Sequence, residues 1–450
     1  MEQFYIEDYL AAPEENGMDG VFSFESLCKI INRDFLREWD EQKDNIRTNL
    51  DIQKKAIIGY KNEVSFFKNK IVELLKNYGG CDDIPDWYES LEDGIYHENW
   101  GLSGIAEWFG EGYRESSSAK VIGERVYFME NGKMQLKEQR ISKERREQLV
   151  RALLLMTPEE RLDKHFHELY MLDGTRVTIF SGSMVKDGQD VIIFRRYIIP
   201  SYTFEEQAAR GTIPAEAIPL FKEMVTLGFN VAFTGAVRTA KTTFLSTWQR
   251  YEDKSLEGVM VETDPEIPIH KLMPDAPVVQ VLADNDRLNS IIKNLLRSDA
   301  DYMIMAEARE GLALDTAIKL ASKGSRRMKI TYHMREPLDF PYDVAGEIVG
   351  TRGGDVHFMA KKVASCFDYI FHFIQLNDKS KKKLKSIYEL TYDRRSDVVS
   401  MEPICEYNCL EDNWKWNYRL SEDKQKAAEE EDIEAYKRFS ALLSDLGGQS

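Results

Sequence analysis

Apolar residues recur along the chain at two different periods, and the period changes near residue 120 and again near residue 200. Over residues 22–78 they return every three or four positions among many charges, which predicts helices that each bury one face. Two glycines at 79 and 80 end this stretch, and a turn-rich, acidic segment with four aromatic residues continues to Gly101. We expect this segment to pack the helices onto the following domain.

Between residues 120 and 200 the pattern shifts to short runs of β-branched and aromatic residues, which are typical of strands. These runs cover residues 121–123, 125–129, 177–180 and 191–194, and a turn at 130–132 follows the second of them. A helical period at 143–156 lies between the second and third runs. We predict a compact mixed α/β domain here, joined to the next one by a linker at Pro200 and Ser201.

From residue 201 onward, short apolar strands alternate with helical stretches, which predicts a parallel sheet built from strand-helix-strand units. The predicted strands are residues 230–234, 258–261, 278–282, 302–305, 328–332 and 369–375. After residue 420 the chain is highly charged, and we interpret its acidic run at 429–432 as a solvated helix face. The predicted parts are a helical region at 1–112, a mixed α/β domain at 113–200, the parallel-sheet domain at 201–420 and a charged helical tail at 421–450.

Composition limits the classes of protein to consider. With 43% hydrophobic and 30% charged residues in 450, the chain is typical of a globular protein with two or three domains. The net charge of −17 disfavours a nucleic-acid motor, and the acidic start lacks a secretion signal, so we expect a cytoplasmic protein. Five cysteines without paired CxxC motifs indicate reduced thiols; Cys405 and Cys409 alone, even as helix neighbours, would make a poor metal site.

The segment from Gly235 to Thr242 carries the clearest chemistry. It follows a buried strand and opens a helix, as a phosphate-binding loop of the form G-x-x-x-x-G-K-[ST] requires. Backbone amides would face the phosphates, Lys241 would supply a positive charge and the Thr242 hydroxyl would reach Mg²⁺. Ala240 replaces the second glycine, which costs about 1–2 kcal/mol if that residue must take a positive φ. The predicted nucleotide-binding residues are Gly235, Ala236, Val237, Arg238, Thr239, Ala240, Lys241, Thr242 and Thr243.

Three more strand ends carry polar residues. Glu307 follows the strand at 302–305, where a carboxylate can orient or deprotonate the attacking water or hold Mg²⁺. Glu262, with Asp264 and Glu266 beyond it, can coordinate Mg²⁺ through water. His333 can sense the γ-phosphate by hydrogen bonding, although a lone histidine is more often structural.

In this order, these pieces resemble the ATPases of type II and type IV secretion and pilus assembly, and most of all their TadA/CpaF branch. The resemblance spans about residues 101–418 and includes an acidic box at 261–266, a Walker B strand at 297–309 and a histidine box at 330–333. It implies a RecA-like ATPase domain, a ring-shaped homo-hexamer and arginines from the preceding domain, with Arg176, Arg195 and Arg196 as candidates. It also implies ATP and Mg²⁺ as cofactors. The implied partners are membrane platform proteins at the cytoplasmic face of the inner membrane, and no sequence-specific binding of nucleic acid is expected.

Two interpretations remain open. In the first, the protein is an ATPase motor for pilus assembly or macromolecule export. In the second, it is a weakly active or inactive nucleotide-binding subunit of such a ring, because Ala240 and Ala306 stand where the family has glycine.

Overall fold

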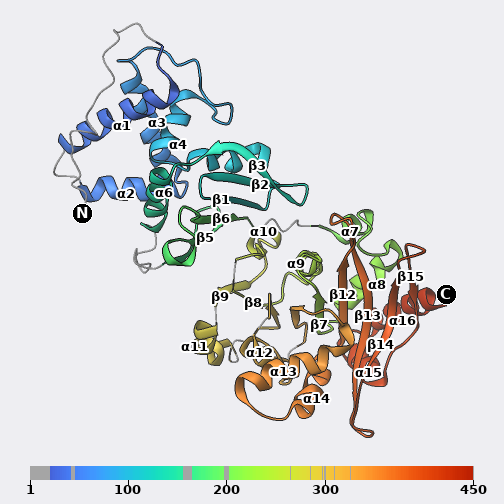
Figure 1. Ribbon diagram of the computed structural model, residues 1–450. Coiled ribbons are helices and arrows are strands. Elements are labelled where there is room, and N and C mark those ends of the chain that lie inside the picture. Colours follow the sequence, from blue (N-terminus) through green and yellow to red (C-terminus); the bar gives the residue numbers. More distant parts are fainter. Residues whose placement is uncertain are drawn as a thin grey trace. The chain divides into compact units, whose positions relative to one another are not determined.

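The computed structural model describes residues 21–41, 46–155, 165–196 and 202–448, except 264, 284, 296, 298, 299, 309 and 325. The chain divides into two compact units, residues 1–198 and 199–450 (Figure 1). The predicted linker at Pro200 and Ser201 falls outside the described residues. The helical region and the mixed α/β domain predicted from the sequence lie within the first unit, and the four-part division of the chain stays a prediction.

The first unit contains a six-stranded antiparallel sheet of order β3-β2-β1-β6-β5-β4. Its strands are β1 (Ser118–Ile122), β2 (Arg125–Glu130), β3 (Lys133–Arg140), β4 (Phe166–Tyr170), β5 (Arg176–Phe180) and β6 (Val191–Arg195). Alternate residues of the central strands point into one core, which α6 (Lys143–Leu154) completes with Leu149 and Leu153. The four predicted strand runs are therefore confirmed, while β3 and β4 were not predicted.

The helical part of this unit has its own core. Its helices are α1 (Phe24–Glu41), α2 (Ile46–Ile57), α3 (Lys61–Leu75), α4 (Leu91–Asn99) and α5 (Ala106–Phe109). Phe35 packs against Phe67 and Trp100, with ring centroids 5.4 and 4.5 Å away. The segment after the paired glycines thus contains a helix, α4, and its aromatic rings pack mainly against α1 and α3. Arg145 of α6 joins the two parts by donating to His97 O at 3.0 Å.

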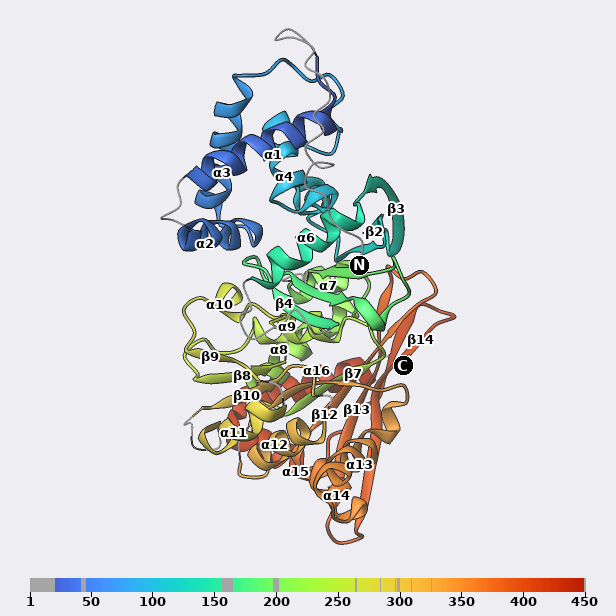
Figure 2. The same ribbon diagram turned by 60° about the vertical axis from the view of Figure 1, so that its left-hand side comes forward.

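The second unit contains a nine-stranded sheet of order β15-β14-β13-β12-β7-β11-β10-β8-β9, in which the strands from β12 to β9 are parallel (Figure 2). Those six are β7 (Val231–Gly235), β8 (Gly258–Glu262), β9 (Val278–Leu282), β10 (Tyr302–Met305), β11 (Lys329–His333) and β12 (Tyr369–Gln375). Each agrees with a predicted strand to within one residue. The predicted fold class, a RecA-like parallel sheet flanked by helices, is confirmed.

Helices cover both faces of this sheet. Val231 and Phe233 of β7 belong to one core, while Ala232 between them belongs to the other, as expected for a strand buried on both faces. The first core includes α7 (Phe204–Ala209), α8 (Ile218–Thr226), α9 (Lys241–Gln249) and α10 (Ile269–Leu272). The second includes α11 (Asn285–Leu295), α12 (Gly311–Ala321), α13 (Phe340–Arg352) and α14 (Val356–Cys366).

The C-terminal part differs from the prediction in two ways. Three antiparallel strands extend the sheet: β13 (Lys382–Asp393), β14 (Val398–Asn408) and β15 (Asn413–Trp416). Cys405 is buried in β14 and is therefore not on a helix. The tail is helical as predicted and forms α15 (Glu422–Glu431) and α16 (Ile433–Gly447). Residues 430–432 of its acidic run are exposed, while α16 buries Phe439 and Leu443 in the first core. None of the helices in the described residues is long and apolar enough to cross a membrane.

Candidate functional site

The predicted phosphate loop joins β7 to α9 (Figure 1). All residues of β7 are buried, so the strand fixes the start of the loop, and α9 begins at Lys241, which fixes its end. At the end of β7, the Thr234 hydroxyl lies 2.9 Å from Nδ1 of the buried His372 on β12. The loop therefore extends from the carboxyl edge of a parallel sheet to a helix N-terminus, where backbone amides are available to an anion.

Three loop residues have positive φ angles: Gly235 at 142°, Arg238 at 66° and Ala240 at 77°. The predicted positive φ at Ala240 is confirmed, and Arg238 shares the conformation, which the sequence pattern did not reveal. A side chain in this left-handed region costs about 1–2 kcal/mol per residue. The loop keeps the conformation of a glycine-rich loop while carrying two residues that oppose it.

Gly235 is required for a different reason. A Cβ atom at this position would lie 2.2 Å from the backbone oxygen of Phe373, far inside van der Waals contact. The two residues are partners in the pairing of β7 with β12. The close approach of these strands therefore excludes any side chain at the first position of the loop.

Lys241 is almost fully buried and points back across the loop. Its Nζ donates to Ala236 O at 2.7 Å and lies 3.2 Å from Nδ1 of His333. The other ring nitrogen of His333 lies 3.7 Å from Oε1 of Glu307. Because β11 lies between β7 and β10, with His333 level with Gly235, the sheet brings three predicted site residues together at one edge.

The turn after β10 is held by β11. Glu307 has a φ of 59°, and its backbone N–H donates to the Thr331 hydroxyl at 2.9 Å. The next amide, of Ala308, donates to Thr331 O at 3.1 Å. The left-handed position is Glu307 and not Ala306, so alanine in place of the family glycine carries no such strain here. Thr331 was not predicted as a site residue, although it lies in the segment 330–333 that resembles a histidine box.

Glu262 ends β8 at the same edge, since β8 pairs with β10. Its side chain is buried, and Oε1 accepts hydrogen bonds from the amides of Glu266 at 3.2 Å and Ile267 at 2.9 Å. This carboxylate thus shapes the loop that follows β8. Asp264, which the sequence groups with it, and Arg309, the last residue of the segment that resembles a Walker B strand, lie outside the described residues.

The metal prediction rests on Thr242, Glu262 and Glu307. Within the described residues, no group of three histidine, cysteine or acidic side chains is arranged to hold an ion by itself. A Mg²⁺ ion bound together with nucleotide needs only one or two protein ligands, because phosphate oxygens and water supply the rest. Thr242, in the first turn of α9 beside Lys241, fits such a site.

The three candidate arginines have different surroundings in the first unit. Arg176 pairs with Glu168 across β4 and β5 at 2.6 Å. Arg196 donates to the backbone oxygens of Tyr113 and Trp108 and lies over the Trp108 ring at 3.9 Å, so its guanidinium holds the unit together. Arg195 at the end of β6 is exposed and is the cross-strand partner of Arg176. Of the three, Arg195 is therefore the most available to a ligand.

His372 is a further site residue that sequence reasoning missed. Burial lowers its pKa to about 4, with smaller effects from the positive charges of Lys385 and Lys241. The ring is thus neutral at physiological pH. The run Tyr369–Gln375 predicted a buried strand, but nothing in it indicated that this ring contacts the end of β7.

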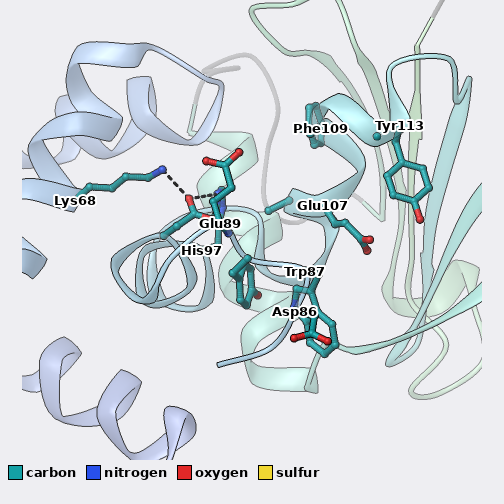
Figure 3. A pocket seen from close by; sticks show the side chains of 13 residues that line it. Lys68, Asp86, Trp87, Glu89, His97, Glu107, Phe109 and Tyr113 are labelled. Carbon is teal, nitrogen blue, oxygen red and sulfur yellow. Dashed lines mark hydrogen bonds and ion pairs between the residues drawn. The ribbon is translucent and has the colours of Figure 1, made fainter. Parts of the chain in front are cut away.

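A cavity of about 470 Å³ lies in the first unit, with Trp87, Phe109 and Tyr113 among its walls (Figure 3). In it, Asp93 Oδ1 lies 2.6 Å from the Lys68 ammonium and 3.4 Å from Nε2 of His97. Although burial favours the protonated acid, His97 and Lys68 hold the pKa of Asp93 below its usual value. None of the site residues predicted from the sequence lines this cavity.

Comparisons with known proteins returned structural likenesses only. No protein-family model and no curated sequence matches the chain. The VirB11 ATPase of the Brucella suis type IV secretion system, solved with sulphate, is 15% identical over 63% of this chain and 92% of its own, with a TM-score of 0.35. The Legionella pneumophila ATPase DotB is 14% identical over 62% and 78%, with a TM-score of 0.44. The pilus retraction motor PilT with ADP is 12% identical over 73% and 86%, with a TM-score of 0.45.

The first is described as an ATPase of a type IV secretion system, the second as an ATPase and the third as a pilus retraction motor. They do not distinguish the tight-adherence branch of the superfamily that the sequence motifs resemble. At these identities and TM-scores they carry no argument about what this chain does.

Proposed function

We propose that this protein is an ATP-hydrolysing motor of the type II/IV secretion ATPase superfamily. The observation that carries the proposal is the meeting of Lys241, His333 and Glu307 at the carboxyl edge of the sheet, beside a loop that opens a helix. Phosphoryl transfer to water requires three kinds of group. They are a positive charge that binds phosphate, a ring that can form hydrogen bonds and a carboxylate that positions water.

The role of each residue follows from its position in the site. Loop amides and Lys241 bind the β- and γ-phosphates, and Thr242 holds the Mg²⁺ that neutralises charge on the phosphate oxygens. Glu307 orients the attacking water and accepts its proton. His333, between Lys241 and Glu307, connects the phosphate end of the site to the water end. Glu262 supports the same edge from β8, directly or through water on the metal.

The family resemblance supplies the larger context of the proposal. In it, six copies form a ring, and Arg195, with Arg176 and Arg196 as the other candidates, completes the nucleotide site from the first unit. The ring works at the cytoplasmic face of the inner membrane on platform proteins of a pilus or secretion system.

A second candidate function is a nucleotide-binding subunit with weak or no hydrolysis. The positive φ angles of Arg238 and Ala240 favour it, because strain in the loop lowers the population of the phosphate-binding geometry. The two functions differ in turnover and not in binding.

The test is phosphate release from MgATP by the purified protein, with and without its platform partner. A motor releases phosphate and loses this activity in Lys241→Ala. Equal background release by wild type and Lys241→Ala in the presence of the partner would overturn the motor proposal. Tight ATP binding in that case would support the second function.

A further inference from the structure

The phosphate loop has a second side, formed by β12 and the start of β13. Phe373 on β12 is the partner of Gly235, and two residues further along Gln375 pairs with Lys382, the first residue of β13. The strand order places this hairpin on the opposite side of β7 from β11, which carries His333. Lys382 therefore stands at the loop edge, away from the cluster of Lys241, His333 and Glu307.

Arg238 and Lys382 are two positive charges near each other at this side. Burial lowers the pKa of the Lys382 ammonium, and the positive charge of Arg238 lowers it further. Among the residues that the structure describes, neither side chain has a hydrogen bond or an ion pair. By contrast, the neighbouring Lys383 is paired with Asp412 at 2.6 Å. Two like charges held together without a partner destabilise each other unless an anion lies between or beside them.

The backbone at Arg238 adds a second, independent observation. Its φ of 66° is one that glycine adopts without strain, so the chain carries a side chain there at a conformational cost. Residues held in such conformations cluster at ligand-binding sites. The exposed guanidinium stands in the middle of a loop whose amides and helix N-terminus already favour an anion.

We propose that Arg238 and Lys382 form a second cationic arm of the phosphate loop, which binds the diphosphate or triphosphate chain from the β12 side while Lys241 binds it from the β11 side. This inference rests on the proposed function, since it names further residues that contact the same ligand. The two positive charges of the arm attract phosphate to a loop whose backbone is strained at Arg238 and Ala240.

The experiment measures the affinities of ADP and of pyrophosphate by calorimetry in wild type, Lys382→Met, Arg238→Gly and Lys381→Met. A lost hydrogen bond to a charged group lowers affinity about tenfold or more, and we expect this loss in the first two variants for both ligands. Pyrophosphate lacks the base and sugar of ADP. An equal loss of affinity for the two ligands would therefore mean that the arm contacts the phosphates. Lys381 is an exposed neighbour in the same hairpin and is the matched control.

Lys382→Arg keeps the charge and should retain most of the affinity, which a purely structural role of Lys382 would not predict. Arg238→Gly also removes backbone strain, which by itself would favour the phosphate-binding geometry, so a loss of affinity in this variant is due to the missing guanidinium. If Lys382→Met and Arg238→Gly bind both ligands as tightly as Lys381→Met does, while Lys241→Ala does not bind, this inference fails and the proposed function stands. If wild type binds neither ligand, both fail.

Discussion

Nζ of Lys241 lies 3.2 Å from Nδ1 of His333, and this contact connects the phosphate loop to the neighbouring strand β11. Through the same ring, Glu307 on the next strand-end turn comes within 3.7 Å. The residues to which we assign phosphate binding and water activation are thus joined through one imidazole.

Glu307→Gln should keep ATP binding and lose hydrolysis. A positioned general base contributes about 10²–10⁴-fold to a rate, so single-turnover phosphate release should fall by at least about a hundredfold. Affinity for a fluorescent ATP analogue should stay within about threefold of wild type, because the amide keeps the size of the side chain. Glu310→Gln, an exposed glutamate nearby, is the control. Equal rates in both variants would remove Glu307 from the mechanism.

Ala240→Gly should strengthen nucleotide binding and raise turnover. Glycine removes a left-handed strain of about 1–2 kcal/mol but loses about 0.5–1 kcal/mol through its freer unfolded chain, so the free energy of unfolding should rise by at most about 1.5 kcal/mol. Urea denaturation and ATP titration check both effects. The same exchange at Ala427, inside α15, should instead destabilise the protein. A loss of stability at both sites would contradict the role assigned to the φ angle of Ala240.

His372 should make the protein less stable in mild acid. Its pKa is about 4 in the fold and near 6.5 in the unfolded chain, so the unfolded state takes up the proton first. The contribution is complete above pH 6.5 and is lost as the pH falls towards 4, by up to about 3 kcal/mol. Urea midpoints measured from pH 4.5 to 7.5 should therefore change more steeply in wild type than in His372→Gln. Parallel curves would contradict this prediction.

Arg195→Ala should lower ATP turnover without lowering stability, because its side chain is exposed and has no hydrogen bond or ion pair among the described residues. Arg176→Ala should lower the thermal midpoint, because it removes the partner of Glu168. Steady-state phosphate release and thermal melting together distinguish the two arginines. Arg125→Ala, on β2 of the same sheet, is the control. Unchanged turnover in Arg195→Ala would shift the role to one of the other two candidates.

Phe439→Ala should destabilise the second unit by about 3–5 kcal/mol, as truncation of a fully buried phenylalanine does. The ring packs 5.5 Å from that of Phe229, just before β7. Lys437→Ala, on the exposed face of the same helix, should change the free energy of unfolding by less than about 1 kcal/mol. Urea unfolding of both variants checks this. A small effect at Phe439 would mean that α16 is not part of the core.

Most of the parallel strands were predictable because burial on both faces makes them nearly continuous apolar runs, as at Val231–Gly235. The antiparallel strands at the C-terminal end were not. β13 begins with lysines and alternates polar with apolar residues, so its run resembles a charged surface segment until its neighbours are known. The helical tail was predicted, but the burial of α16 was not, since the many charges of the tail concealed the apolar stripe that contains Phe439 and Leu443.

The site was predictable where chemistry follows a strand end. Glu307 and His333 were expected at the sheet edge, and the structure brings them together with Lys241. The roles given to these residues stay predictions. Contacts between distant segments, such as that of Thr234 with His372, leave no local pattern in a sequence, and neither does the backbone angle of Arg238.

The carbonyl of Phe373 beside Gly235 also limits which substitutions the loop can tolerate. At Arg238 and Ala240 the obstacle to a side chain is a torsion angle, which stability gained elsewhere can offset. At Gly235 the obstacle is an atom of the adjacent strand, so even Gly235→Ala would have to separate β7 from β12. Of the three positive-φ positions in this loop, the one that retains glycine is the one where space as well as conformation excludes a side chain.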